Sequence, residues 1–283
     1  MIDIHTHIFP PEVCRDRTSF FPGEPGFELL YRDEKKGPLS TAGGLIKAMD
    51  RKGIQASVTF GFPWRKPELV RRSNDYVREA MARFPERLLG FACLNPELPD
   101  AVEEGERCLR AGMKGLGELA LYSSPAEGSW FDRMSPLVEL AARWEVPVLL
   151  HINEPVGHQY PGKGRQPFWE LYELIKTFPT TRFILAHWGG GLWWYQLMKR
   201  EVKEVLANTY FDTAASPFLY RPEIYEFAIK LLGTGKILYG SDYPLLGLER
   251  YLEEMDQAGL LSKQQEAILG GNSQRVLGWP AIY

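Results

Sequence analysis

Cysteine is scarce in this chain, since its 283 residues include only Cys14, Cys93 and Cys108. An odd number of widely spaced cysteines without a CxxC pair indicates neither a disulfide framework nor a zinc–thiolate site. The sequence also has no run of about 18 apolar residues, which argues against a membrane-spanning helix. Its first residues lack a basic segment followed by an apolar one, so no secretory leader is indicated. These absences favour a cytoplasmic protein without a membrane partner.

An excess of positive charge is missing as well. The chain has 33 Lys and Arg residues against 36 Asp and Glu residues, a formal net charge of −3 that argues against nucleic acid as a partner. Hydrophobic residues make up 45% and charged residues 24%, as is typical of a globular protein. We therefore expect one domain over residues 1–283 that acts on a small molecule. The sequence leaves open whether this domain forms a homodimer.

Short apolar or β-branched runs alternate along the chain with longer segments of helical spacing. One such segment covers 137–144, and Ser135 followed by Pro136 indicates its start. The runs 146–152 and 182–187 are almost continuously apolar, as expected of strands that are buried on both faces of a parallel sheet. Eight candidate strands follow from this pattern: 2–7, 54–60, 88–94, 113–118, 146–152, 182–187, 207–213 and 236–242.

Eight strand–helix repeats without a break in composition predict an α/β fold, specifically a single (β/α)8 TIM barrel, with functional groups at the C-terminal ends of its strands. A doubly wound open sheet is the alternative, but neither GxGxxG nor GxxxxGK[ST] occurs in the chain. The gap after the first strand is unusually long and rich in proline and aromatic residues. Residues 8–38 are therefore expected to form a lid-like loop, with disorder as the alternative.

Four of the five histidines lie at the predicted strand ends. His5 and His7 end the first strand, and because they are two residues apart their side chains point to the same face. His151 ends the fifth strand and His187 the sixth. Since the strand ends of a barrel converge, these imidazoles predict a site for a divalent cation. The alternative is a set of hydrogen-bonded or surface histidines.

Two carboxylates complete this pattern. Glu118 ends the fourth strand and Asp242 the eighth, where they would offset the charge of a cation, and one carboxylate can bridge two ions. Asp242 could instead form a turn before Pro244, and Glu118 could be a buried carboxylate paired with a base. We expect one or two divalent ions, most simply zinc, with manganese, iron or cobalt as alternatives. The expected ligands are His5, His7, Glu118, His151, His187 and Asp242.

Several motifs together resemble the amidohydrolase superfamily, specifically its amidohydrolase-related (amidohydrolase 2) branch. They are the HTH of 5–7, ILAHWGG around His187, LYGSDYP around Asp242 and the closing ILGGNSQRVLG. The resemblance covers nearly the whole chain and implies a distorted (β/α)8 barrel with one or two metals at the strand ends. It also implies that Asp242 shuttles a proton.

The chain departs from that branch at the fourth strand. Two-metal members commonly carry a carboxylated lysine there, whereas this chain has Glu118 in a GLGELALY context that also looks like the TatD-type nucleases. Single-metal decarboxylases of the branch use the HxH pair, a later histidine and the aspartate as ligands. By that resemblance, His187 is catalytic rather than a ligand.

A divalent metal lowers the pKa of bound water to about 7 and so produces a nucleophile at neutral pH. Asp242 is then the expected proton acceptor, and a free His187 could stabilise an oxyanion or donate a proton to a ring carbon. The sequence therefore favours a metal-dependent hydrolase of an ester, lactone or amide bond. The alternatives are a single-metal non-oxidative decarboxylase, a TatD-like nuclease and a metal-binding barrel without catalysis.

Substrate contacts are expected from the loops after the strands. Tyr122 and Trp188 suit a planar or apolar substrate, and His158 with Arg165 could hold a carboxylate by charge-assisted hydrogen bonds. The alternative is that these residues pack the loops or are solvated. Asp212, near the end of the seventh strand, is expected to be a buried carboxylate whose hydrogen bonds are satisfied.

Overall fold

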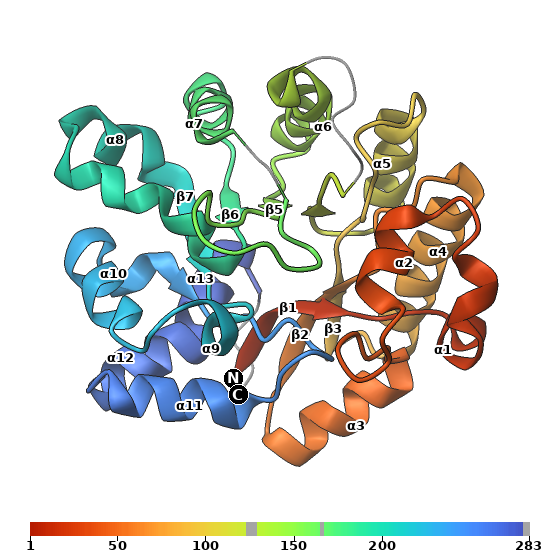
Figure 1. Cartoon of the computed structure of the whole chain (residues 1–283), viewed down its shortest axis with the longest axis horizontal. Coiled ribbons are helices and arrows are strands. Elements are labelled where there is room, and N and C mark those ends of the chain that lie inside the picture. The colour runs from red at the N-terminus through yellow and green to blue at the C-terminus, as the bar shows by residue number, and fades with distance from the viewer. Residues whose placement is uncertain (123–128, 165–166, 280–283) are drawn as a thin grey trace.

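The protein is described here by a computed structural model that covers residues 1–122, 129–164 and 167–279. Strands lie at the centre of this part of the chain and helices surround them (Figure 1). The strands are almost entirely buried, which explains their continuous apolar runs. The strands among these residues are β1 (Ile2–His7), β2 (Ala56–Phe60), β3 (Leu88–Gly90), β4 (Leu116–Leu119), β5 (Val148–Leu150), β6 (Phe183–Leu185), β7 (Thr209–Asp212) and β8 (Ile237–Leu238).

All the strand pairs are parallel, and they form one sheet in the order β1-β2-β3 and another in the order β4-β5-β6-β7-β8. A parallel bridge joins Ala92, after β3, to Leu116 of β4. On the other side a bridge joins Thr6 of β1 to Tyr243, after β8. The predicted α/β fold with parallel strands is thereby confirmed.

Five of the strands, β3 and β5 to β8, end earlier than predicted, and the early ends of β6 and β8 affect predicted site residues. His187 and Asp242 have φ angles of 55° and 57°, so the chain leaves the extended conformation before it reaches them. Positive φ is uncommon for residues other than glycine, and the sequence around these residues did not indicate it. Both side chains therefore project from the turns that follow β6 and β8 rather than from the strands.

The helices cover the outside of the strands (Figure 1). The larger hydrophobic core contains residues of the helices and of the strands, and a smaller cluster consists mainly of strand residues such as Ile4, Val58 and Ile184. No helix in the described ranges is both long and apolar enough to cross a bilayer. The α-helices are α1 (Pro11–Arg15), α2 (Pro25–Tyr31), α3 (Ala42–Lys52), α4 (Pro67–Arg83), α5 (Ala101–Arg110), α6 (Trp130–Arg143), α7 (Phe168–Thr177), α8 (Arg200–Val205), α9 (Ser216–Leu219), α10 (Ile224–Leu232), α11 (Leu248–Gln257), α12 (Ser262–Glu266) and α13 (Asn272–Leu277). The 3-10 helical segments are η1 (Arg17–Phe20), η2 (His187–Leu197), η3 (Leu206–Asn208) and η4 (Thr234–Lys236), and η5 (Ala267–Gly271) is π-helical.

Helix α6 begins before the predicted position. Ser129 caps it by accepting a hydrogen bond from the backbone N–H of Phe131 at 3.1 Å, so Pro136 lies inside the helix and not at its start. A proline there leaves the carbonyl of Asp132 without its usual backbone donor. The hydroxyl of Ser135 lies 3.4 Å from that carbonyl and donates to it. Ser135 thus compensates for Pro136 within the helix.

The segment 8–38 is not the irregular loop that its composition suggested. It contains α1, η1 and α2, and its Phe9 and Phe27 are fully buried. Pro11 and Pro25 each stand at the start of a helix, a position where the missing N–H costs nothing. The prediction of a loop therefore needs correction, because the aromatic side chains pack into the core. A lid function for this segment stays a prediction.

Candidate metal centre and active site

Six residues predicted from the sequence lie together at the C-terminal ends of the strands. Two of them come from β1, where alternation along the strand turns both imidazoles to the same side. The others come from segments far apart in the chain, and all six are buried or nearly so. They are His5 and His7 of β1, Glu118 of β4, His151 directly after β5, His187 at the start of η2 and Asp242 after β8.

Four of these side chains surround one point. His5 Nε2 lies 3.6 Å from Asp242 Oδ1 and 3.8 Å from Glu118 Oε1. His7 Nε2 lies 3.4 Å from Asp242 Oδ1 and 3.9 Å from Glu118 Oε2. A cation with bonds of about 2.1 Å separates its ligand atoms by about 3.0–3.4 Å. The four side chains are therefore spaced nearly as the ligands of one divalent cation would be.

The outer hydrogen bonds of His5 and His7 determine which nitrogen faces this point. His7 Nδ1 lies 3.0 Å from the carbonyl oxygen of Gly61, and because a carbonyl only accepts, His7 Nδ1 carries the proton. His5 Nδ1 in the same way donates to Asp212 Oδ2 at 2.8 Å. In the neutral tautomers, both Nε2 atoms then present a lone pair to the centre.

The second pair of histidines is fixed in the same manner. His187 Nδ1 donates to the carbonyl of Ala214 at 3.0 Å, which leaves Nε2 facing inward. His151 donates from Nε2 to the carbonyl of Gly162 at 2.8 Å, which leaves Nδ1 facing inward. Backbone carbonyls thus orient both rings toward Glu118.

Two of the three distances in this second group are those of hydrogen bonds. His151 Nδ1 lies 2.8 Å from Glu118 Oε1 and 3.2 Å from His187 Nε2, and His187 Nε2 lies 3.6 Å from Glu118 Oε1. Two lone pairs and a carboxylate oxygen cannot approach this closely without a proton or a cation between them. The spacing of this group therefore suits a shared proton, although the same three residues could also ligate an ion.

The electrostatics of the metal-free centre favour protonated histidines beside ionised acids. Burial alone would lower the pKa of His5, but the charges of Asp212 and Glu118 raise it to about 10. For His187 burial is likewise outweighed by a hydrogen bond to Glu118 and by the charge of Asp242, which together raise its pKa to about 9.

The two acids of the centre respond in the opposite direction. Burial alone would raise the pKa of Glu118, but the neighbouring His151 and His5 hold that pKa well below its usual range. Burial also opposes ionisation of Asp242, yet a hydrogen bond from His7 and the charge of His5 lower the pKa of Asp242 to about 2. Both acids are therefore available as anionic ligands.

The donor set fits a divalent metal. His5 Nε2 is buried and has no hydrogen-bond partner among the described residues, although it faces two carboxylates. A buried nitrogen without a partner is costly, whereas the same nitrogen is satisfied as a ligand. His5, His7 and Glu118 offer ligand atoms that lie within 4.8 Å of one another. Imidazole and carboxylate donors suit zinc and manganese alike.

Asp212 is the satisfied buried carboxylate that the sequence predicted. Besides His5 Nδ1 it accepts the backbone N–H of His187 at 2.9 Å and that of Ala214 at 3.0 Å. It is fully buried at the end of β7. One side chain thus connects β1 with the turn that carries His187.

An aromatic wall lies beside the centre. Tyr122 stacks on Phe62 with ring centroids 5.5 Å apart. Tyr122 and His151 pack edge to face with ring centroids 5.2 Å apart. Tyr31 of α2 packs against Phe62 at 5.9 Å, and burial together with the charges of Asp242 and Glu118 raises the pKa of the Tyr31 phenol. The sequence did not single out Tyr31. Only its place in the aromatic segment 8–38 could have suggested it.

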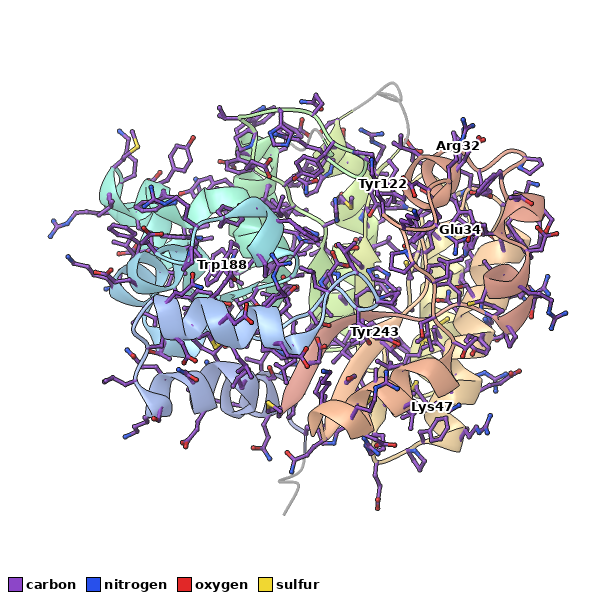
Figure 2. All side chains as sticks on the ribbon, turned by 60° about the horizontal axis from the view of Figure 1, so that its bottom comes forward. Arg32, Glu34, Lys47, Tyr122, Trp188 and Tyr243 are labelled. Atoms are coloured by element: carbon purple, nitrogen blue, oxygen red, sulfur yellow. The ribbon has the colours of Figure 1, made fainter. Side chains whose placement is uncertain are left out.

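The other residues predicted to bind substrate lie elsewhere. Trp188 is fully buried, its ring packs on the edge of Tyr225 at 5.0 Å, and its indole N–H donates to Ser216 Oγ at 3.0 Å. Trp188 lies well apart from Tyr122 (Figure 2) and is a packing residue of the core, which differs from the expectation that it lines the pocket. His158 is exposed in the loop after β5. Arg165 lies outside the described residues.

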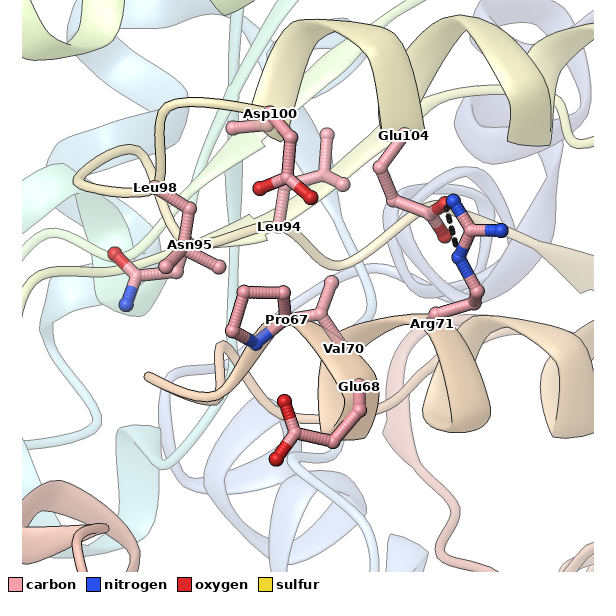
Figure 3. Close-up of a pocket in the computed structure, with 10 residues that line it drawn as sticks. Pro67, Glu68, Val70, Arg71, Leu94, Asn95, Leu98, Asp100 and Glu104 are labelled. Carbon is pink, nitrogen blue, oxygen red and sulfur yellow. Dashed lines mark ion pairs between the residues drawn. The ribbon is translucent and has the colours of Figure 1, made fainter.

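A separate pocket lies on the outside of the strands, between α4 and α5 (Figure 3). Pro67, Val70 and Leu94 form part of its lining, and Arg71 pairs with Glu104 across it at 3.8 Å. It is lined by none of the six strand-end residues. The candidate active site is therefore the strand-end cluster and not this pocket.

Comparison with known proteins gives a family match over almost the whole chain. The sequence profile of the family described as amidohydrolase matches residues 2–279. A curated relative, the gamma-resorcylate decarboxylase of Rhodococcus jostii (strain RHA1), is 25% identical over 312 residues, which cover 92% of this chain and 92% of that protein. The predicted resemblance to this family is confirmed.

Two solved structures illustrate the similarity of the fold. The dihydroxybenzoic acid decarboxylase of Polaromonas sp. JS666, with bound manganese and the inhibitor 2-nitroresorcinol, has a TM-score of 0.72 at 21% identity, covering 99% of this chain and 97% of that chain. The 5-carboxyvanillate decarboxylase of Novosphingobium aromaticivorans DSM 12444, also with manganese, has a TM-score of 0.76 at 17% identity, covering 98% and 96%.

These comparisons overturn the prediction of a hydrolase. The similar enzymes named above are decarboxylases, which agrees with the alternative drawn from the sequence. The prediction failed because metal ligands at strand ends are compatible with several reactions, and the ligand types alone do not distinguish them. The expectation of zinc also lacks specific support, because the metal in these two structures is manganese.

Proposed function

Because the chain belongs to the amidohydrolase family, we propose that it is a metal-dependent enzyme that removes the carboxyl group from a small aromatic acid. The names of its relatives support this reaction class. The observation that carries the proposal is the division of the centre into two parts. One part has the spacing of a cation site, and the other has the spacing of a hydrogen-bonded histidine pair.

We assign the metal to the first part, with His5, His7, Asp242 and Glu118 as the residues that hold it. When bound, a divalent cation supplies positive charge that orients and polarises the oxygen atoms of the substrate. His151 is 2.8 Å from Glu118 and orients this carboxylate. The parallel bridges between Ala92 and Leu116 and between Thr6 and Tyr243 connect the two sheets on both sides. They support a closed eight-stranded barrel around this site.

The second part of the centre supplies the proton. His187 Nδ1–H is held by the carbonyl of Ala214, so Nε2 is the nitrogen that faces the centre and is placed to carry the transferred proton. His187 Nε2 gives this proton to the ring carbon that bears the carboxylate. The bond from that carbon to the carboxyl group then breaks, its electron pair returns to the ring, and carbon dioxide leaves. His187 is left neutral and takes up a proton from solvent.

The aromatic wall supports a planar aromatic molecule as the substrate. Phe62 and Tyr122 stack with an interplanar angle of 3°, and Tyr31 packs edge-on against Phe62 at 79°, so these rings line an aromatic wall next to His151. A planar ring packs well against such a surface, and its carboxylate then faces the cationic centre. We propose a hydroxylated benzoic acid as the substrate, in keeping with the substrates named for the relatives.

The proposal is tested with protein loaded with manganese or zinc and a panel of mono- and dihydroxybenzoic acids. Release of carbon dioxide is measured together with the product, and the reaction is repeated in deuterium oxide. We expect one deuterium at the ring carbon that carried the carboxylate, because the proton from His187 exchanges with solvent. Carbon dioxide release without ring deuteration would contradict the proton transfer. Failure to release it from any member of the panel would contradict the proposed reaction.

A further inference from the structure

The hydroxyl group of Tyr251 joins two turns that follow neighbouring strands. Tyr251 lies on α11 and is fully buried. Its O–H donates to the carbonyl of Ser241 at 2.8 Å, in the turn after β8. The same oxygen accepts the backbone N–H of Ala215 at 3.1 Å, in the turn after β7. Because β7 and β8 pair in parallel, both turns lie at the end of the strands where the candidate active site is.

The bond to Ala215 holds the peptide group that orients His187. The carbonyl of Ala214 and the N–H of Ala215 belong to one planar peptide group, and because it is trans these two groups point in opposite directions. Its N–H donates to Tyr251, and its carbonyl accepts His187 Nδ1–H at 3.0 Å. A rotation of this plane would break both hydrogen bonds together. Tyr251 therefore positions the acceptor that orients the ring of His187.

The bond to Ser241 acts on Asp242 in the same way. The carbonyl of Ser241 and the backbone nitrogen of Asp242 belong to one peptide group, so Tyr251 holds the plane from which Asp242 projects. The preceding peptide group is held as well, because the N–H of Ser241 donates to Asp3 Oδ1 at 3.0 Å. The backbone that leads into Asp242 is thus fixed by two buried side chains.

The two turns need such support because each contains a residue in an unfavourable backbone conformation. Ala215 and Asp242 have φ angles of 56° and 57°. Residues with a side chain rarely adopt positive φ, and they keep it only where the surrounding structure holds them. The angle φ describes the rotation of a residue relative to the peptide group before it. Tyr251 bonds to that peptide group in both cases.

We infer that Tyr251 is a positioning residue that sets His187 and Asp242 in place relative to each other. The inference rests on the proposed function, in which Asp242 holds the metal and His187 delivers the proton. Among the described residues the hydroxyl of Tyr251 bonds only to backbone groups, so it acts through the two turns. A shift of about 1 Å between an acid and the bound substrate can slow a reaction by about 10²-fold.

The substitution Y251F tests the inference because it removes only this hydroxyl group. The ring packs against Tyr239 with centroids 5.4 Å apart, and phenylalanine keeps that contact. The matched control is Y76F, since the hydroxyl of Tyr76 also accepts a backbone N–H, that of Ala42 at 2.9 Å. Circular dichroism and thermal unfolding verify that both variants are folded.

At saturating metal we expect kcat of Y251F to fall by roughly 10–100-fold, with a smaller change in KM, because Tyr251 does not contact the substrate. Metal affinity is expected to fall by about tenfold, since the backbone before Asp242 loosens. Y76F should stay within about twofold of the wild type in all three quantities, as its hydroxyl bonds elsewhere. Wild-type kcat or wild-type metal affinity in folded Y251F overturns the inference.

A double variant tests whether Tyr251 acts through His187. In H187Q there is no proton donor left to position, so we expect Y251F to lower kcat by at most about threefold in that background. Effects of the two substitutions that simply multiply would show that Tyr251 acts independently of His187, and would overturn the inference.

Nuclear magnetic resonance of the zinc-loaded protein gives a measurement that needs no substrate. The ring proton on His187 Nδ1 should exchange with solvent at least about tenfold faster in Y251F than in the wild type or Y76F. Unchanged exchange overturns the role of Tyr251. A wild type that decarboxylates nothing, but shows the faster exchange in Y251F, overturns the proposed function alone. If Y251F does not fold, the wild-type Ala215 amide decides, since rapid exchange there would contradict its bond to Tyr251.

Discussion

His5 Nδ1 donates to Asp212 Oδ2 over 2.8 Å, and both side chains are fully buried. The other oxygen of Asp212 accepts the backbone N–H of His187. One carboxylate therefore determines the tautomer of a proposed metal ligand and the position of the proposed acid. The two functions of the centre depend on the same residue, which is itself not a proposed ligand.

Replacing Asp212 by asparagine tests this dependence. The side-chain amide that D212N introduces can donate to His5 Nδ1, which then gives up its proton, so the proton moves to Nε2 and removes the lone pair that faces the metal. We expect metal affinity to fall by about 10–100-fold, as for other residues that orient metal-binding histidines. The metal affinity of each variant is measured by competition with a chromophoric chelator. D132N, at an exposed position of α6, is the control, and unchanged affinity in D212N would refute the role.

Replacing His187 by glutamine separates proton transfer from metal binding. Glutamine keeps a polar side chain of similar reach but cannot carry a proton at neutral pH, so we expect decarboxylation to slow by about 10²–10⁴-fold. Metal content, measured by elemental analysis, is expected to stay at the wild-type level because His187 is outside the proposed ligand set. Loss of the metal in H187Q would mean that His187 is a ligand instead.

Metal binding is expected to release protons. The pKa of His5 is raised to about 10 in the metal-free protein by Asp212 and Glu118, so His5 is protonated at pH 7 and must lose its proton to bind a cation. Apparent affinity should therefore rise about tenfold per pH unit for each proton released between about pH 6 and pH 8. Calorimetry in two buffers of different ionisation enthalpy counts the protons. Binding heats that do not depend on the buffer would contradict this prediction.

Glu254 is expected to make stability fall as the pH rises. Burial raises its pKa from 4.5 to about 7, so the folded protein holds this proton more tightly than the unfolded chain does. The stabilisation is complete below pH 4.5 and is lost as the pH rises through 7. With an allowance for screening by solvent, E254Q is expected to gain about 1 kcal/mol at pH 8, or about 2–4 °C in Tm, and nothing at pH 4. E253Q, at the exposed neighbour, is the control, and a Tm difference independent of pH would contradict the assignment.

The strand pattern and the clustering of His5, His7, Glu118 and Asp242 could be predicted because they depend on local periodicity. An apolar run with β-branched residues forms a buried strand almost regardless of its partner, and parallel strands bring their C-terminal ends to one side. The start of α6 and the helices of 8–38 could not be predicted as well. Several nearby positions offer a capping residue or a proline with which a helix could begin, and the sequence does not tell which of them is used.

The sequence by itself determined the α/β architecture, the family and the set of residues that meet at the strand ends, because each follows from short patterns along the chain. Only the tertiary structure decided which nitrogen of each histidine faces the centre, since Asp212, Gly61, Gly162 and Ala214 are distant in sequence from the rings that they hold. It also decided that Trp188 packs in the core while Trp194 is exposed. Hydrogen bonds and burial between distant segments depend on how the whole chain packs, and no local pattern encodes them.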